Sequence, residues 1–270
     1  YMTDWDQCPA NVAHSGAIAP TLDWMEMFPW SDGRNFDGQR YYRQRPAEVD
    51  IFANRDPRLY ESMVVQKRDF QFQYYGSENP VQMWEGGQFL ICGAEWACKP
   101  WGFCNFKYVL DFGSNDQGGQ GIIDNDPMQI SYLRLAEMYL IYAEALAEMD
   151  RLPEAVEQVN IVRRRVGLGN IEVMNPDLHL TSNKDNLIKE ILRERACELG
   201  MECESRFHDM NRRLLVDDFK KHLRGMHIYR LNDNNERVEE AWNAESGEPF
   251  PTKFEYEDYE IQGGNPRFVW

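Results

Sequence analysis

The sequence predicts a predominantly α-helical fold, in which a helical scaffold carries irregular, loop-rich segments and a few short strands. Two observations lead to this prediction. Apolar residues recur at helical spacing through the second half of the chain, whereas the first half is rich in turn residues and aromatic rings. The change near Pro127 separates a loop- and aromatic-rich ligand-binding portion, 1–128, from a helical scaffold with an acidic C-terminal segment, 129–270. We expect both portions to belong to one domain.

The helical prediction is clearest over 129–215. Residues of one helix face recur at steps of three and four, namely Leu133, Ala136, Leu140, Ala143 and Ala147. A turn at 150–152 leads into a second helix that begins near Pro153 and ends at 167–169. Small side chains allow these two helices to pack closely as an antiparallel hairpin, as in helical-repeat (TPR-like) proteins. A third helix, expected from Asn183 to Met210 with a weak capping signal at Ser182, partly covers the hairpin.

In the first portion, regular structure is expected only in short pieces. A helix over Pro20–Phe28 has Thr21 as its capping residue. Strict alternation of aromatic and polar residues at 70–74, and a similar pattern at 106–112, predict two short strands.

Composition restricts the function more than it defines it. The 270 residues hold 29 basic and 45 acidic side chains, a net charge of −16, which disfavours a nucleic-acid partner because phosphate binding needs a basic face. The apolar runs are too short to span a membrane. Ten carboxylates between Asp233 and Glu260 predict a solvated surface segment.

No cofactor or metal is expected. The spacing of Cys92, Cys98 and Cys104 does not fit a zinc pattern, although these three and Cys8 could form disulfides in an oxidising compartment. Cys197 and Cys203 are interpreted as thiols within a helix. The acidic, Gly-rich loop at 111–126 lacks the spacing of an EF-hand, and a solvated loop is favoured over a calcium site.

Catalytic motifs are missing from the sequence. The five histidines are scattered, and the nucleophile elbow, the P-loop and the dinucleotide fingerprint do not occur. With 45 acidic residues, some carboxylate pair is inevitable and carries no information. Charges of both signs on the helices are interpreted as structural ion pairs. The residues in question are Arg134, Glu137, Glu144, Arg163, Arg165, Glu194, Arg195, Glu198, Arg206, Asp209 and Arg212.

Aromatic residues are the feature that suggests binding. Six of the eight tryptophans lie in the first 101 residues, mostly among turn residues and beside Asn and Gln. Rings and planar amides suit sugars, because the CH faces of a sugar stack on rings while its hydroxyls pair with amides. The alternative is that any single ring fills the core. The predicted ligand-binding residues are Tyr41, Tyr42, Tyr74, Tyr75, Asn79, Gln82, Trp84, Trp96 and Trp101.

Several stretches, taken together and in order, resemble the SusD/RagB family. They are 54–59 (NRDPRL), 132–137 (YLRLAE), 142–146 (YAEAL), 160–168 (NIVRRRVGL), 191–195 (ILRER) and 204–212 (ESRFHDMNR). The sequence departs from the family pattern at Cys197 and Gly200 and at the C-terminus, 265–270, which leaves the subfamily and its ligand open.

The resemblance implies a SusD-like scaffold and a role in binding without catalysis. Members are surface-exposed, lipid-anchored outer-membrane proteins of Bacteroidota that capture nutrients, usually glycans, for a SusC-like TonB-dependent transporter. They are about twice as long as this chain, which would correspond to their C-terminal half, with the lipid anchor and further helical repeats ahead of it. Two alternatives to glycan capture stay open: a peptide-binding member of the family, and a carbohydrate hydrolase with an unrecognised carboxylate pair.

Overall fold

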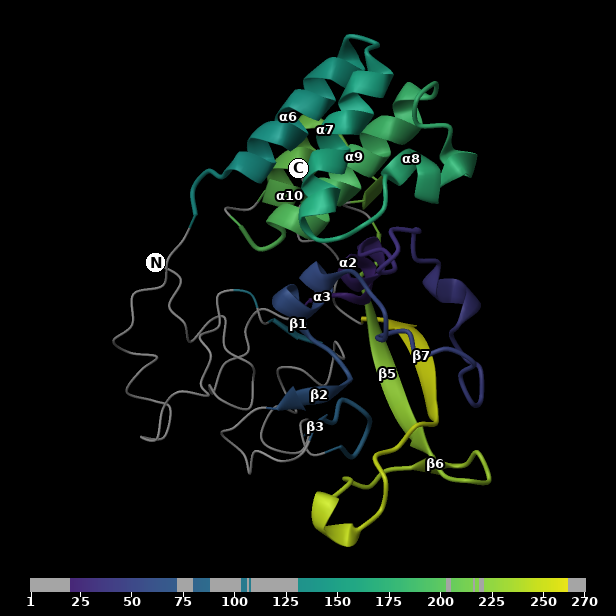
Figure 1. Ribbon diagram of the computed structural model, residues 1–270. Coiled ribbons are helices and arrows are strands. Elements are labelled where there is room, and N and C mark those ends of the chain that lie inside the picture. Colours follow the sequence, from purple (N-terminus) through teal and green to yellow (C-terminus); the bar gives the residue numbers. More distant parts are fainter. Residues whose placement is uncertain are drawn as a thin grey trace, which may run out of the picture.

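A hairpin of two helices forms the centre of the helical part of this computed structural model (Figure 1). The structure describes residues 20–71, 80–87, 103–105, 107, 131–202, 205–215, 217–218 and 221–261. The hairpin consists of α6 (Leu135–Glu148) and α7 (Leu152–Arg165). Asp150 turns the chain with a φ of 58°, and Gly167 follows α7 with a φ of 81°, a conformation that glycine adopts without steric cost. The predicted hairpin is confirmed.

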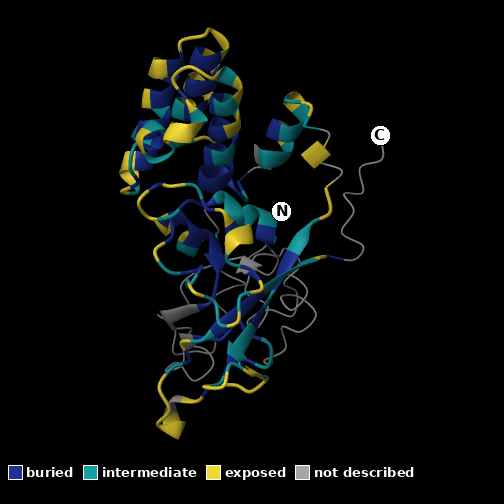
Figure 2. Cartoon of the chain, turned by 90° about the vertical axis from the view of Figure 1, so that its right-hand side faces the viewer, coloured by how far each residue is buried: buried dark blue, intermediate teal, exposed yellow. Residues whose placement is uncertain are grey.

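The face between these helices is filled by small and β-branched residues. Ala143, Ala147, Ala155 and Val159 are fully buried there, and Ile191 of α9 (Lys184–Leu199) packs into the same cluster. Short segments α8 (Ile171–Met174) and η4 (Pro176–Leu178) connect α7 to α9. The outer positions of the hairpin are exposed, whereas those that face α9 are buried (Figure 2).

The third helix is shorter than the sequence predicts. It ends at Leu199, and a separate helix, α10 (Ser205–Arg212), follows. A β-carbon at Gly200 would lie 2.2 Å from the Trp24 ring, so glycine is needed where the two segments meet. Met201 then turns the chain with a φ of 65°. The capping residue also differs from the prediction, since Asn183 rather than Ser182 accepts the hydrogen bond, from the amide of Asn186.

Short helices form the first part of the described chain. The predicted capped helix is α2 (Leu22–Met27), where the Thr21 hydroxyl accepts a hydrogen bond from the amide of Trp24. A 3₁₀ turn, η1 (Gly38–Arg40), comes next. The third segment, α3 (Pro57–Ser62), begins within the RDPRL sequence, where Asp56 caps the helix and Pro57 occupies its first turn.

Two small antiparallel pairs follow. One joins β1 (Met63–Val64) to β4 (Cys104–Asn105), and the other joins β2 (Lys67–Gln71) to β3 (Pro80–Val81). The strand predicted at 70–74 therefore begins earlier, within β2, and its remaining residues lie outside the described part. Of the strand predicted at 106–112, only Lys107 is described.

The carboxylates from Asp233 to Glu248 are exposed, as predicted for a solvated acidic segment. Part of this segment nevertheless belongs to a three-stranded sheet near the C-terminus, where residues 254–256 are buried. Its strand order is β6 (Arg237–Val238), β5 (Arg224–Leu231), β7 (Phe254–Glu260), with all pairs antiparallel. Another 3₁₀ turn, η5 (Ala244–Ser246), lies between β6 and β7. Phe254 and Tyr256 of β7 are buried in the core. Even Glu255 is buried, because Arg45 and Arg237 pair with its carboxylate.

The sheet and the first part share one hydrophobic core. That core joins Leu22, Phe52 and Phe103 to Met226 and Tyr256, whereas the helical hairpin has its own. The helix α2 contacts both α9 and β5, so it lies where the two cores meet (Figure 1). The predominantly helical fold class is confirmed, and the boundary at 128 stays a prediction. The junction around α2 is where the candidate site is found.

Candidate functional site

Five of the nine predicted binding residues, Tyr74, Tyr75, Asn79, Trp96 and Trp101, lie outside the described residues, and their role stays a prediction. The other four are placed by the structure and do not come together on one open surface. They lie in two groups, around Tyr41 and around Trp84.

Trp84 and Gln82 lie in the core. The Trp84 ring is fully buried between Phe250 and Phe254, and its Nε1 donates a hydrogen bond to the carbonyl of Glu240 at 3.0 Å. The Gln82 side chain makes two hydrogen bonds with the backbone of Trp242. Its Nε2 donates to the Trp242 carbonyl at 2.7 Å, and its Oε1 accepts from the Trp242 backbone N–H at 2.9 Å. These contacts fix the C-terminal segment to the first part, so ligand binding at either residue would require this loop to open.

Tyr42 and Tyr41 differ in exposure although they are neighbours. Tyr42 is 7% exposed, and its hydroxyl donates a hydrogen bond to Glu26 at 2.8 Å. Burial raises the pKa of Tyr42, and the nearby Glu26 carboxylate adds to the effect. Tyr41 is half-buried, with its ring stacked on Phe36 and edge-on to Trp30. Of the four predicted residues that the structure describes, Tyr41 keeps the most ring area open to a ligand.

The charged helix residues form ion pairs, as the sequence indicates. Arg58 is the centre of one network and lies 2.7 Å from carboxylate oxygens of Asp56 and Glu194, and 3.0 Å from Glu198. Arg163, which is fully buried, pairs with the same Glu194 at 3.1 Å. Because α3, α7 and α9 each contribute to it, this network fixes the helices relative to one another.

A second network joins the start of α6 to the ends of α9 and α10. Arg134 pairs with Glu198 at 2.6 Å and with Glu202 at 2.7 Å. On the other side, Asp209 accepts hydrogen bonds from Arg195 and from Arg212, both at 2.7 Å. Most of these groups are occupied by a partner of opposite charge, which supports the structural interpretation over a catalytic one.

The pKa of Glu198 shows how strong these pairs are. Burial of its carboxylate would raise the pKa, but the cations Arg58 and Arg134 outweigh burial and lower it to about 2. Glu194, with Arg58 and Arg163 beside it, also has a lowered pKa despite burial. Both carboxylates therefore stay ionised at neutral pH.

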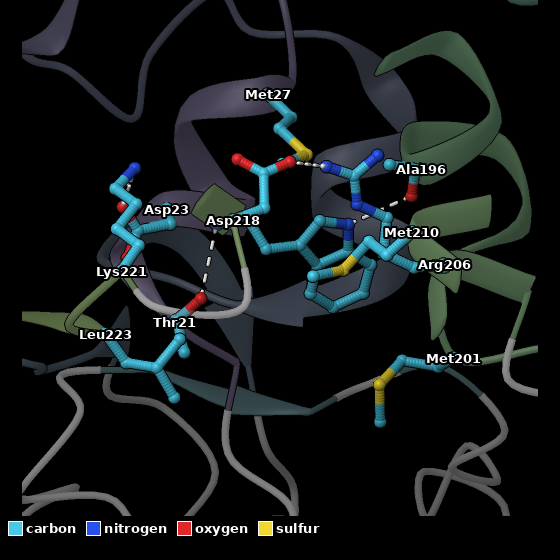
Figure 3. Close-up of a pocket in the computed structure, with 12 residues that line it drawn as sticks. Thr21, Asp23, Met27, Ala196, Met201, Arg206, Met210, Asp218, Lys221 and Leu223 are labelled. Carbon is cyan, nitrogen blue, oxygen red and sulfur yellow. Dashed lines mark hydrogen bonds and ion pairs between the residues drawn. The ribbon is translucent and has the colours of Figure 1, made fainter. Parts of the chain in front are cut away.

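A pocket that the sequence reasoning missed opens beside α2 (Figure 3). Its volume is about 280 Å³. It lies between α2, the end of α9, α10 and the segment that leads into β5. Its wall is mainly apolar and consists of Trp24, Met27, Ala196, Gly200, Met201, Met210 and Leu223. The signal in the sequence is the spacing of Trp24 and Met27, which fall on the side of α2 opposite the buried Leu22 and Met25.

Two ion pairs flank this pocket. Arg206 lies 3.2 Å from Asp218, and Lys221 lies 2.8 Å from Asp23. In Figure 3 Asp23 and Lys221 are drawn at the left, on the side of Leu223, and Asp218 and Arg206 are drawn in the upper middle, with Met201 below them. Thr21 completes the polar part of the lining, but its hydroxyl already caps α2. The pocket thus has an apolar interior. Its polar edge, which we term the mouth, is formed by these two ion pairs and has no net charge.

Two further properties concern the described part of the chain alone. Within 20–71, 80–87, 103–105, 107 and the described residues of 131–261, no three His, Cys, Asp or Glu side chains are placed to hold a metal ion. None of the helices in these segments has the length and apolarity to cross a bilayer.

Comparison with known proteins decides the family. The sequence model of the SusD family matches residues 2–262. The chain belongs to the SusD family. Among solved structures, a SusD-like protein from Bacteroides fragilis NCTC 9343 has a TM-score of 0.60 and 23% identity, over 93% of this chain and 43% of that one. A SusD superfamily protein from Bacteroides vulgatus ATCC 8482 has a TM-score of 0.49 and 18% identity, over 78% of this chain and 37% of that one. No curated protein matches the sequence.

Membership confirms the resemblance and places its motifs. In this SusD family member, the stretches 132–137, 142–146 and 160–168 fall in or beside α6 and α7, 191–195 falls in α9, and the described part of the last stretch, 205–212, forms α10. Several of their charged residues take part in the two networks, namely Arg134, Arg163, Glu194, Arg195, Asp209 and Arg212. At 23% identity the B. fragilis structure shows the fold, and the chain spans less than half of that protein's length.

Proposed function

We propose that this protein is a non-catalytic cell-surface protein that captures glycans for import through a SusC-like TonB-dependent transporter. Membership of the SusD family over residues 2–262 is the observation that carries this proposal. It supports a location at the outer membrane, where a lipid anchor would hold the protein. Binding residues are commonly placed on loops that a rigid frame supports, and the ion-paired helices of this chain provide such a frame.

The electrostatics support binding over catalysis. Hydrolysis of a glycosidic bond by two carboxylates needs one of them to keep its proton near neutral pH, and so needs a raised pKa. Among the carboxylates of the described residues, every resolved shift is downward, as for Glu144, Glu194 and Glu198. These groups are engaged by arginines and are poor general acids.

The proposed ligand surface consists of the loops between Tyr41 and Trp101. Tyr41 provides a half-exposed ring, and Tyr74, Tyr75, Asn79, Trp96 and Trp101 provide the rings and amides that the sequence assigns to the loops. The test is a titration of the full natural protein with a panel of oligosaccharides and peptides, followed by tryptophan fluorescence. Saturable change with an oligosaccharide supports the proposal, whereas change with peptides alone would replace glycan by peptide as the ligand.

The same titration examines the enzymatic alternative. After prolonged incubation with the protein, the bound oligosaccharide should be recovered intact by mass spectrometry. Cleavage that a single Asp or Glu substitution abolishes would show that the protein is a hydrolase.

A peptide ligand is the second candidate, and one observation favours it. The net charge of −16 would attract basic peptides electrostatically. For such a ligand, affinity should fall steeply as salt is raised, whereas the affinity for a neutral glycan should change little.

A further inference from the structure

The pocket beside α2 has no role in the proposed function, because none of the residues assigned to glycan binding lines it. Its volume of about 280 Å³ is near the lower end of the range for ligand pockets, roughly 300–1,000 Å³. A space of this size holds one large side chain or one small ring. An extended polymer would not fit inside it.

The wall of the pocket selects an apolar group. The Nε1 of Trp24 donates its hydrogen bond to the carbonyl of Ala196 at 2.9 Å, so the indole has no polar atom left for a ligand. Met27, Met201 and Met210 add flexible thioethers, which adapt to side chains of different shape. A sugar in this space would lose water around its hydroxyls without gaining partners, which is unfavourable.

The mouth of the pocket offers one donor group and one acceptor group side by side. The guanidinium of Arg206 lies 3.2 Å from the carboxylate of Asp218, and their side chains are 29% and 47% exposed. An exposed pair of this kind contributes little to folding, so both groups can turn toward a ligand at small cost. A carboxylate accepts from a backbone N–H, and a guanidinium donates to a backbone carbonyl. The pair therefore matches the two polar groups of a peptide unit.

The balanced charge at the mouth further restricts the chemical class of the ligand. Lys221 and Asp23 form the other pair at 2.8 Å, so the two ion pairs together carry no net charge. A group with a single strong charge would meet attraction and repulsion together at this mouth, whereas a neutral peptide backbone meets neither.

We propose that this pocket binds an apolar side chain, aromatic or aliphatic, of a peptide whose backbone pairs with Arg206 and Asp218. The inference goes beyond the proposed function, because it holds whether or not the aromatic loops capture glycans.

The test uses three capped tripeptides, acetyl-Ala-Phe-Ala-amide and its Leu and Gln counterparts, titrated calorimetrically into the full natural protein. The Phe and Leu peptides should bind, and the Gln peptide should bind about tenfold more weakly or not at all. Absence of binding by the Phe peptide, or equal affinity for Phe and Gln, would overturn the proposal. The first result would also be expected if another segment of the protein filled the pocket.

Two substitutions with matched controls locate the binding. Met210→Gln puts an amide in the apolar wall and should weaken the Phe peptide about tenfold, whereas Met149→Gln, on a residue 66% exposed on the hairpin, should not. Arg206→Gln replaces the guanidinium at the mouth by a shorter, uncharged amide and should weaken every peptide that binds. Its control is Arg164→Gln, which breaks a similarly exposed pair with Glu157. Equal effects of a substitution and its control would place binding elsewhere.

Folding and the proposed function are monitored separately. If Met210→Gln lowers the midpoint of urea unfolding, that variant no longer tests binding. The comparison of Arg206→Gln with Arg164→Gln then decides. Oligosaccharide affinity should be the same in all four variants, because none of the substituted residues is among those assigned to glycan binding. A failure of peptide binding with glycan binding intact would therefore overturn this inference and leave the proposed function standing.

Discussion

Arg58 lies among three carboxylates, and its side chain is 8% exposed. Forming such a buried cluster adds little net stability, because removing the charges from water offsets much of their attraction. Removing one member has a much larger effect, because the remaining charges stay buried without compensation. The value of the network is thus in specifying how α3 and α9 fit together.

The first prediction concerns that cluster. Arg58→Ala should lower the free energy of unfolding by about 3–5 kcal/mol, since Glu194 and Glu198 lose their shared cation. Urea unfolding monitored by circular dichroism measures the effect. Arg164→Ala, which breaks the exposed pair with Glu157, should leave it nearly unchanged. Similar losses in both variants would contradict a special role for the buried network.

Glu198 leads to a prediction about acid stability. Its folded-state pKa of about 2 is below the ordinary value of 4.5, so the unfolded state binds more protons in between. Stability from this group is therefore fully present above about pH 4.5 and is lost as the pH falls toward 2. The size of the effect is roughly 3 kcal/mol for a side chain that is 1% exposed.

The measurement is the free energy of unfolding from pH 6 to pH 2. In Glu198→Gln the loss of stability on acidification should be shallower than in the natural protein, because the substituted amide does not titrate. Glu157→Gln serves as the control: Arg164 lowers the pKa of Glu157 too, but solvent screens this exposed pair, so the slope should change much less than in Glu198→Gln. Identical slopes in all three proteins would show that Glu198 does not have a lowered pKa.

At the level of elements, Gly200 lies where the helix predicted over Asn183–Met210 is divided into α9 and α10. Nothing in the local sequence requires a break of α9 there, since the φ of Gly200 is −54°, within the range that other residues adopt. The need for glycine comes from a long-range contact, because the Trp24 ring of α2 occupies the space of a β-carbon. A pattern of apolar spacing does not contain this information, and so the sequence predicts one helix through to Met210.

The third prediction tests that contact. Gly200→Ala should lower the free energy of unfolding by about 1–3 kcal/mol, because the added methyl group overlaps the Trp24 ring. In the background of Trp24→Leu, where the ring is absent, the same substitution should have a much smaller effect. The double-mutant cycle therefore measures the coupling between α2 and α9. Additive effects would show that Trp24 does not determine where α9 ends.

The C-terminal sheet was missed for a different reason. Counting charges over Asp233–Glu260 hides the alternation in β7, where Phe254 and Tyr256 face the core while Glu255 and Glu257 occupy the other face. The alternation is visible in the sequence, but a count of acidic residues over the whole segment does not detect it. Arg45 and Arg237 make the burial of Glu255 possible, and both are distant from it in sequence.

Across the whole molecule, local periodicity predicted the helices and their hairpin, because close packing of Ala143, Ala147 and Ala155 is encoded within 129–215. The candidate pocket was not predictable in this way. Its wall comes from four separated segments, and Trp24 meets Met210 only because α2 packs on α9. Burial of Trp84 and Gln82 was also unpredictable, since their partners, Glu240 and Trp242, are more than 150 residues away.

At this scale we distinguish two parts of the molecule: a helical frame that buried ion pairs hold together, and the aromatic loops that we propose to bind the ligand. The most direct test is the oligosaccharide affinity of Trp101→Ala in the full natural protein, measured by calorimetry alongside its urea midpoint. The account predicts a loss of roughly 1–3 kcal/mol in binding free energy, by analogy with ring stacking on nucleic-acid bases, at an unchanged midpoint. Unchanged affinity, or loss of the folded state, would contradict it.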